Sequence, residues 1–395
     1  MKWKIIIALS FCFFLTGCWN YRELSDLSIS TGISIDKEGD EYKVGMLISN
    51  AQKIQGNSKE GESQTIVIDA KGKTIMEAIK NIELKSPKEV YIRHLLVVVV
   101  SEEVAKEGLN KILDYLFRDP QSRKMFYIIL ARDCKAKDTL KILSPLEAFP
   151  SQSIAINIEE TYDLQAIITK VTYNSFLKEL LEPGKEPYIN SVMIDGKAEE
   201  GEKEDNVKQT EPDAAIRMST VGIFKGDKLL GWTSKDENRG INVLNGNIGL
   251  MYLTFDYKES PTTISLSTIK TKTSVKIKDE KPIIEVSITG TGNINEINQK
   301  IDLEDPKVIE EIEKATEKEL KKNVNKGLEV AQKTYKSDIF GYGSMIHKTY
   351  PKEWKKMKKN WNEEEFPNLE VKIKTDVVLE HKGSLEKTIK EEIHE

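Results

Sequence analysis

Residues 91–132 read YIRHLLVVVVSEEVAKEGLNKILDYLFRDPQSRKMFYIILAR, and this stretch decides the class of the fold. It contains two apolar runs, at 95–100 and 125–131, which are too short to cross a bilayer and are typical of buried strands. Between them, residues 102–117 predict a helix. A strand, a helix and a second strand in succession predict a domain in which helices pack on a sheet.

The same alternation continues toward the N-terminus. Residues 28–36 and 41–49 are β-rich runs on either side of a Lys37-Glu38-Gly39-Asp40 turn, which predicts a hairpin. Residues 52–63 are polar and predict a mobile loop, and residues 74–84 have the apolar spacing of a helix. This region therefore favours an α+β or α/β domain.

The stretch 198–213 is acidic and almost free of apolar residues, which predicts an exposed loop or linker. We take it as the boundary between an N-terminal region, 18–197, and a C-terminal region, 214–390, with a further division near 258–262. Beyond the boundary, runs rich in Thr, Val, Ile and Ser are typical of half-solvated antiparallel strands.

Helical signals dominate the last third of the chain. Asp305 as N-cap and Pro306 at the first helical position predict a helix that runs to about residue 335, slightly weakened by Gly327. A second helical region covers 344–361, and Pro351 should kink it or mark its true start. Residues 369–380 alternate as a last strand.

Composition excludes several classes of protein. A chain of 395 residues suits two or three domains. With 39% apolar and 31% charged residues, it is too hydrophobic for a disordered chain and too charged for a protein that spans the membrane several times. A formal net charge of −5 argues against a general nucleic-acid binder, so we expect no nucleic-acid partner.

The N-terminus has the features of a bacterial lipoprotein signal. Lys2 and Lys4 form a basic segment, and residues 5–15 form a short apolar segment, as in a secretory signal. The sequence Leu-Thr-Gly-Cys at 15–18 then resembles a lipobox. We therefore expect residues 1–17 to be removed and Cys18 to carry an S-diacylglycerol and an N-acyl chain. An ordinary signal peptide or an uncleaved short anchor are the alternatives.

The three cysteines have different expected fates, and none of them predicts a disulfide framework. Cys12 leaves with the signal and Cys18 is alkylated. Two or more acyl chains hold a protein stably on a membrane. Cys134 remains as the one free thiol, and we expect it to be a buried or half-buried filler.

No residue pattern points to catalysis, a metal or a cofactor. Gly72-Lys73-Thr74 follows a strand and precedes a helix, but a phosphate-binding loop needs a further glycine where this chain has Val67. We therefore interpret it as a turn and a helix start. The four histidines have no partner at metal-ligand spacing, and no nucleophile elbow is present.

The helical region 344–361 is the most unusual surface feature. It carries six lysines and one glutamate, while Trp354, Met357 and Trp361 recur on one face. One interpretation places this helix on an anionic lipid surface or an acidic partner. The alternative, which we favour, packs the Trp and Met face into the core and leaves the lysines in water.

Short motifs along the whole chain resemble those of one protein family. They are Gly17-Cys18-Trp19, Arg22-Glu23-Leu24, the run 32–36, Arg93-His94, Gly231-Trp232, Glu237, Arg239, Gly240, the run 338–343, Trp354, Trp361, Phe366 and the closing strand to Gly383. Together they resemble the Ger(x)C lipoproteins, the C subunits of nutrient germinant receptors in spore-forming bacteria.

The resemblance implies an α+β protein of two to three packed domains, elongated, with mixed and largely antiparallel sheets. It also implies a lipoprotein without catalytic activity or cofactor, on the outer face of the spore inner membrane, beside integral-membrane A and B subunits. Only Cys18 is carried over with a definite role. An extracytoplasmic solute-binding lipoprotein is the alternative function, and a wall hydrolase is a third.

Overall fold

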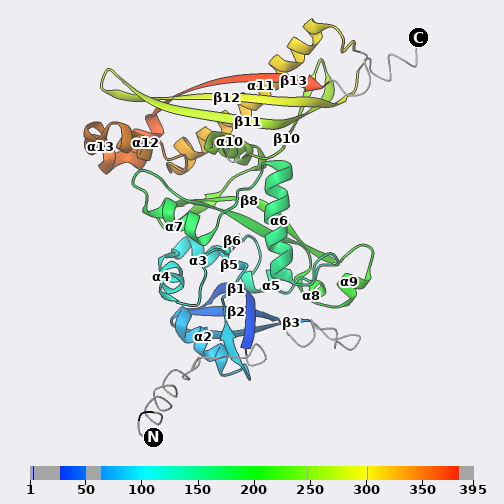
Figure 1. Ribbon diagram of the computed structural model, residues 1–395, viewed down its shortest axis with the longest axis vertical. Helices are drawn as coiled ribbons and strands as arrows, with labels where there is room; N and C mark the ends of the chain where they lie inside the picture. The colour runs from blue at the N-terminus through cyan, green and yellow to red at the C-terminus, as the bar shows by residue number, and fades with distance from the viewer. Residues whose placement is uncertain (1–2, 4–26, 50–63, 247, 300, 382–395) are drawn as a thin grey trace.

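The computed structural model describes residues 3, 27–49, 64–246, 248–299 and 301–381, and it confirms the mixed α+β class. These residues form two sheets that lie one above the other along the long axis of the molecule (Figure 1). The first sheet has nine strands and the second has four. Cys18 and the predicted loop at 52–63 lie outside the described residues.

The first sheet has a parallel centre with antiparallel hairpins on both sides. Its order is β3-β2-β1-β5-β6-β7-β8-β9, and β4 also pairs with β1. The parallel strands are β1, β5, β6 and β7, and β2 and β1 form the predicted hairpin. The bounds are β1 Leu27–Glu38, β2 Glu41–Ser49, β3 Thr65–Gly72, β4 Glu89–Tyr91, β5 Val97–Ser101, β6 Tyr127–Ala131, β7 Tyr188–Gly196, β8 Ala214–Lys225 and β9 Lys228–Trp232.

Helices cover both faces of this sheet because its central strands are apolar on both sides. Val98 and Val100 of β5 face one core, whereas Val97 and Val99 face the other. The first core is covered by α2 Ile75–Glu83, α3 Glu102–Glu107, α4 Asn110–Arg118 and α7 Tyr173–Leu181, and the second by α5 Ala136–Thr139 and α6 Pro150–Gln165. The chain therefore leaves β5 toward one face and β6 toward the other.

The predicted helix at 102–117 is interrupted, so the sequence reading was wrong at this point. Gly108 has a φ of +130° and ends α3, and α4 starts after it. Asp227 of the β8–β9 turn fills the gap, since its backbone oxygen accepts from Leu109 N at 2.9 Å and its carboxylate from Asn110 N at 3.0 Å. The apolar run at 95–100, predicted as a buried strand, forms β5 from Val97 onward, and β4 ends before it at Tyr91.

The predicted linker at 198–213 contains α8 Ala198–Gly201 and α9 Asp205–Lys208. It connects β7 to β8, which are antiparallel neighbours in one sheet. Asn206 is buried and bonds to the backbone oxygens of Leu143 and Ala214 at 3.0 and 2.9 Å. The polar composition thus reflects a short helical connection held by side-chain hydrogen bonds. The division of the chain into the regions 18–197 and 214–390 stays a prediction.

The second sheet has the order β10-β11-β12-β13, and only its last pair is parallel. Glu313 and Glu317 of α11 accept from the backbone N–H groups of Leu379 and Val377, so this helix covers part of the outer edge of β13. The bounds are β10 Met251–Tyr257, β11 Ser260–Lys278, β12 Lys281–Ile297, α11 Pro306–Glu329 and β13 Glu370–His381. Asp305 caps α11 as predicted.

The two sheets are joined through α10 Lys235–Asn245, which lies between them and crosses α11 at two glycines. A Cβ on Gly240 would lie 2.0 Å from the backbone oxygen of Asn323, and one on Gly327 would lie 2.6 Å from Ile241 N. The helices therefore touch backbone to backbone. Gly327, which weakens α11 by propensity, is what permits this close crossing.

We expect Gly240→Ala to lower the free energy of unfolding by about 1–3 kcal/mol, because the new methyl group meets the backbone of α11. Helix propensity alone predicts the opposite sign, a gain of up to about 1 kcal/mol. Urea denaturation of the two proteins decides between them. The control is Asn325→Ala, at an exposed position of α11, which gains helix propensity without bringing a methyl group against a neighbouring backbone. If the Gly240→Ala protein is as stable as this control, the close crossing of the two helices is contradicted.

Candidate functional site

The predicted lipidation site, Cys18, lies outside the described residues, so its role stays a prediction. Among the described residues, no helix is both long and apolar enough to span a membrane. The described chain contains two other candidates for a functional site. One is a polar crevice at the carboxyl ends of the parallel strands, and the other is a buried cluster around Asp338 between the two halves of the molecule.

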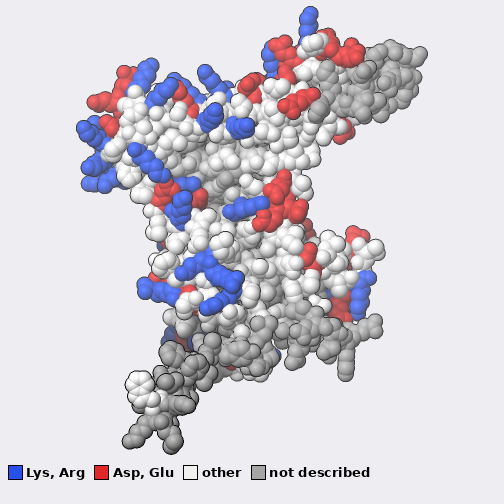
Figure 2. All heavy atoms as spheres, viewed as in Figure 1, with Lys and Arg blue, Asp and Glu red and all other residues white. Residues whose placement is uncertain are grey.

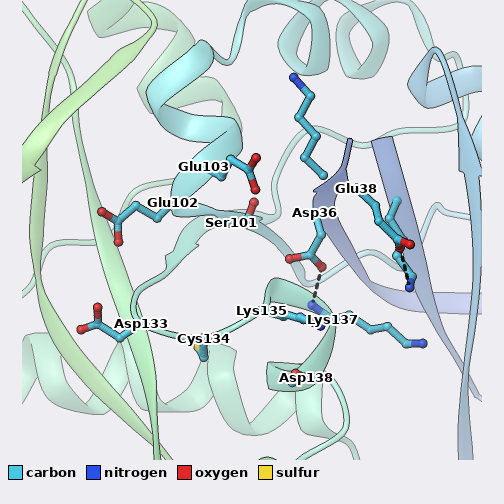
Figure 3. Close-up of a pocket in the computed structure, with 12 residues that line it drawn as sticks. Asp36, Glu38, Ser101, Glu102, Glu103, Asp133, Cys134, Lys135, Lys137 and Asp138 are labelled. Carbon is cyan, nitrogen blue, oxygen red and sulfur yellow. Dashed lines mark hydrogen bonds and ion pairs between the residues drawn. The ribbon is translucent and has the colours of Figure 1, made fainter. Parts of the chain in front are cut away.

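The crevice opens between β5 and β6, where the chain leaves for opposite faces of the sheet (Figure 3). In open α/β sheets this is the place where ligands bind. Its volume is about 390 Å³. It is lined by Asp36, Lys37, Glu38, Lys43, Ser101, Glu102, Glu103, Asp133, Cys134, Lys135, Lys137 and Asp138.

Most of the charged groups in the crevice are engaged by other parts of the protein. The carboxylate of Asp36 accepts from the backbone N–H groups of Ala136 and Lys137, both at 2.8 Å, and so fixes the start of α5. Burial raises the pKa of Asp36, and these two N–H groups act in the opposite direction. Lys37 pairs with Glu107, and Lys137 with Asp69. These groups hold the loops of the crevice in place.

The crevice lacks an activated nucleophile. Burial, with a smaller effect of the neighbouring Asp138, raises the pKa of the Cys134 thiol to about 12, so the sulfur is protonated at neutral pH. Cys134 is half-buried, as expected for a filler. The hydroxyl of Ser101 caps α3 by accepting from Val104 N. Among the described residues there is no group of three His, Cys, Asp or Glu side chains that could hold a metal ion.

The buried cluster is built on the carboxylate of Asp338, which is fully buried. Oδ1 accepts from the backbone N–H groups of Gly341 and Tyr342 at 2.9 and 3.2 Å. Oδ2 accepts from Gly343 N at 2.7 Å and from the indole Nε1 of Trp361 at 2.9 Å. Asp338 thus fixes the start of α12 Tyr342–Thr349 and anchors Trp361 against it.

The same cluster ties the C-terminal half to the loop after α7. The backbone oxygen of Asp338 accepts from Glu186 N at 2.9 Å, and the Glu186 carboxylate accepts from Asn362 Nδ2 and Gly226 N, both at 2.6 Å. A Cβ on Gly184 would lie 2.5 Å from the carbonyl carbon of Gly343, so the two backbones are in direct contact. We call residues 182–187, 224–227, 337–344 and 361–363 the Asp338 joint.

The basic helical region resolves into two helices. Pro351 is the first residue of α13 Pro351–Met357, which confirms that it marks a helix start. Trp354, Met357 and Trp361 are buried, at 5%, 8% and 3% exposure, which confirms the interpretation that we favoured. All six lysines of this region are exposed, and they are Lys348, Lys352, Lys355, Lys356, Lys358 and Lys359. A blue cluster at the upper left of Figure 2 lies where Figure 1 places α13.

Comparison with known proteins identifies relatives that match nearly the whole chain. Residues 20–194 match a model described as the spore germination protein N-terminal domain, and residues 219–383 match one described as spore germination B3/GerAC like, C-terminal. Spore germination protein KC of Bacillus subtilis (strain 168) is 31% identical over 385 residues, which cover 95% of this chain and 94% of that protein. The chain belongs to this spore germination family.

Other relatives agree with this placement. Spore germination protein B3 of the same organism is 26% identical, over 88% of this chain and 90% of that protein. The crystal structure of the GerBC protein superposes with a TM-score of 0.53, at 21% identity, over 91% of this chain and 99% of that chain. The likeness to GerBC shows that the fold is shared.

The structure assigns physical roles to three of the motifs that carry the resemblance. Glu237 closes a capping box with Ser234 at the start of α10, Gly240 allows the helix crossing, and the run 338–343 builds the Asp338 joint. Sequence reasoning quoted these residues without a role. An acidic residue three positions before Gly-Tyr-Gly is the signal that would have predicted a capped helix start at 341.

The ionisation of Asp338 couples stability to pH. Burial raises the pKa of Asp338 to about 6, although its four N–H donors act in the opposite direction. A folded-state pKa above the unfolded value of about 3.9 means that the stability linked to protonation is fully present below pH 4. It is lost as the pH rises through 6.

We expect Asp338→Asn to lower the free energy of unfolding by roughly 3 kcal/mol at pH 7, because an amide cannot accept four hydrogen bonds. Between pH 4 and pH 7 the wild-type protein should lose stability relative to the variant as the pH rises. Urea denaturation at several pH values measures this difference, and the exposed Asp40→Asn is the control. A difference that grows with pH would mean that the four donors outweigh burial and lower the pKa.

Proposed function

We propose that this protein is the C subunit of a nutrient germinant receptor, held by a lipidated Cys18 on the outer face of the spore inner membrane. In this role it works beside integral-membrane A and B subunits, in assembly or signalling of the receptor, and performs no catalysis. The observation that carries the proposal is the relationship to spore germination protein KC over 95% of the chain.

Further observations support a role in assembly. The sequence Leu-Thr-Gly-Cys at 15–18 supplies a tether, while in the described residues no helix could replace it as a membrane span. The charged groups of the crevice are largely used to hold its own loops, and the Cys134 thiol is protonated. These features suit a protein that acts through its surfaces, and no observation favours the solute-binding alternative over it.

We expect Cys18→Ala to release the protein from membrane fractions and to leave its fold intact, because the first described strand starts nine residues later. Immunoblotting of membrane and soluble fractions, washed at high salt, measures the release. Cys134→Ala is the matched control and should stay with the membrane. Retention of the Cys18→Ala protein would show that contacts with other subunits, or an uncleaved signal, hold it.

Deletion of the gene should abolish germination triggered by the nutrient that this receptor recognises. The loss of refractivity of a spore suspension measures it, and a restored wild-type gene should return the response. Full nutrient response of the deletion strain, with no paralogue expressed, would contradict the receptor assignment. If a Cys18→Ala gene restores the full nutrient response to the deletion strain, the protein functions in the receptor without its lipid anchor.

A further inference from the structure

One edge of the first sheet collects loops that the proposed function does not use. The parallel strands β1, β5 and β6 begin at this edge, and two segments, 84–96 and 117–125, lie beside their first residues. We call these two segments the amino-end rim. It contains the Arg93-His94 motif, and both of these side chains are exposed.

Hydrogen bonds hold the rim against the start of β1. Ser86 Oγ lies 2.9 Å from Ser28 Oγ, and β4 within the rim pairs in parallel with residues 27–29. Leu96 N donates to Thr31 O at 2.9 Å, and Tyr127 N donates to Leu96 O at 2.8 Å. The rim and the first residues of β1 therefore lie side by side, at the opposite end of the strands from the polar crevice.

Large apolar side chains of the rim point into solvent. Leu84 is 86% exposed, Met125 72% and Phe117 57%. Leu84 follows the end of α2, Phe117 lies in the last turn of α4, and Met125 lies two residues before β6. Lys124 Nζ lies 4.7 Å from the ring centre of Phe117, so a cation stands directly beside an exposed aromatic ring.

The rim is basic in a chain that is acidic as a whole. It carries six Lys or Arg residues against Glu89 and Asp119, while the full chain has a net charge of −5. Arg118 pairs with Asp114 and Lys85 donates to Asp69 O, so these two cations are partly engaged. The other four are exposed or half-buried, and they are Lys88, Arg93, Arg123 and Lys124.

The tether limits where this surface can be. Leu27 lies nine positions after Cys18, and a fully extended chain across nine positions spans at most about 30 Å. A lipidated Cys18 therefore keeps the start of β1, and the rim beside it, within that distance of the lipid. Exposed apolar and aromatic side chains among lysines and arginines are the combination that binds the interface of an anionic bilayer.

Resting on the proposed lipid anchor, we propose that the amino-end rim lies on an anionic membrane surface. Leu84, Phe117 and Met125 enter the interface, and the basic side chains contact the lipid headgroups. The lysines of α13 differ, because the apolar face of that helix is buried in the protein. The Arg93-His94 motif then belongs to the membrane-facing surface of the molecule.

Depth-dependent quenching tests this orientation. The full-length lipoprotein, with Cys134→Ser and either Met125→Cys or Val378→Cys, is labelled with a fluorophore and reconstituted into vesicles that contain nitroxide-labelled lipid. Val378 is exposed on β13 of the second sheet and serves as the matched control. In equimolar phosphatidylglycerol and phosphatidylcholine we expect at least twofold stronger quenching at 125 than at 378.

A charge-reversed rim, with Arg93→Glu, Arg123→Glu and Lys124→Glu, should abolish the excess quenching at 125. The same three reversals at Lys352, Lys355 and Lys356 on α13 should leave it unchanged. Equal quenching at 125 and 378, or the same excess in pure phosphatidylcholine, would overturn the proposal. The mass of the mature protein shows separately whether Cys18 is lipidated, and so tests the proposed anchor. A Cys18→Ala protein added to the same vesicles tests whether the amino-end rim binds the membrane without the lipid anchor.

Discussion

The carboxylate of Asp338 accepts four hydrogen bonds inside the protein, and the positions of several elements depend on it. Three of its donors are the backbone N–H groups of the residue that caps α12 and of the first two residues of that helix, and the fourth is the indole of Trp361. The backbone oxygen of the same residue binds the loop after α7. A buried acid that is removed from water must find such donors, since an unpaired one would be strongly destabilising. The arrangement of the two halves around this point is therefore tightly determined.

The sequence predicted helix starts correctly where neighbouring residues alone determine them. Asp305 and Thr74 cap helices at the predicted positions, and Pro351 starts α13. Prediction failed where a distant residue intervenes. The helix at 102–117 is broken because Asp227, far away in sequence, satisfies the N–H groups freed after Gly108. No periodicity within 102–117 contains that information.

The candidate sites also differ in whether neighbouring or distant residues form them. The predicted lipobox rests on a few adjacent residues, whereas the Asp338 joint joins segments that are more than 150 residues apart in the chain. A resemblance to a family identified the residues 338–343 and Gly240 without their physical roles. The structure supplies these roles as backbone contact and hydrogen bonding, which are properties of pairs of segments that no single segment reveals.

The parallel pairing of β13 with β12 has a consequence for the order of folding. Parallel neighbours need a long crossover, and here it contains α11, α12, α13 and the buried residues of the Asp338 joint. The second sheet is thus completed only when the last strand arrives, after everything between 298 and 369 has been made. Contacts so distant in sequence form slowly. A chain secreted across a membrane from its N-terminus would carry its first sheet outside before the second could close, so a premature stop shortly before 370 should be as damaging as the loss of the whole C-terminal half.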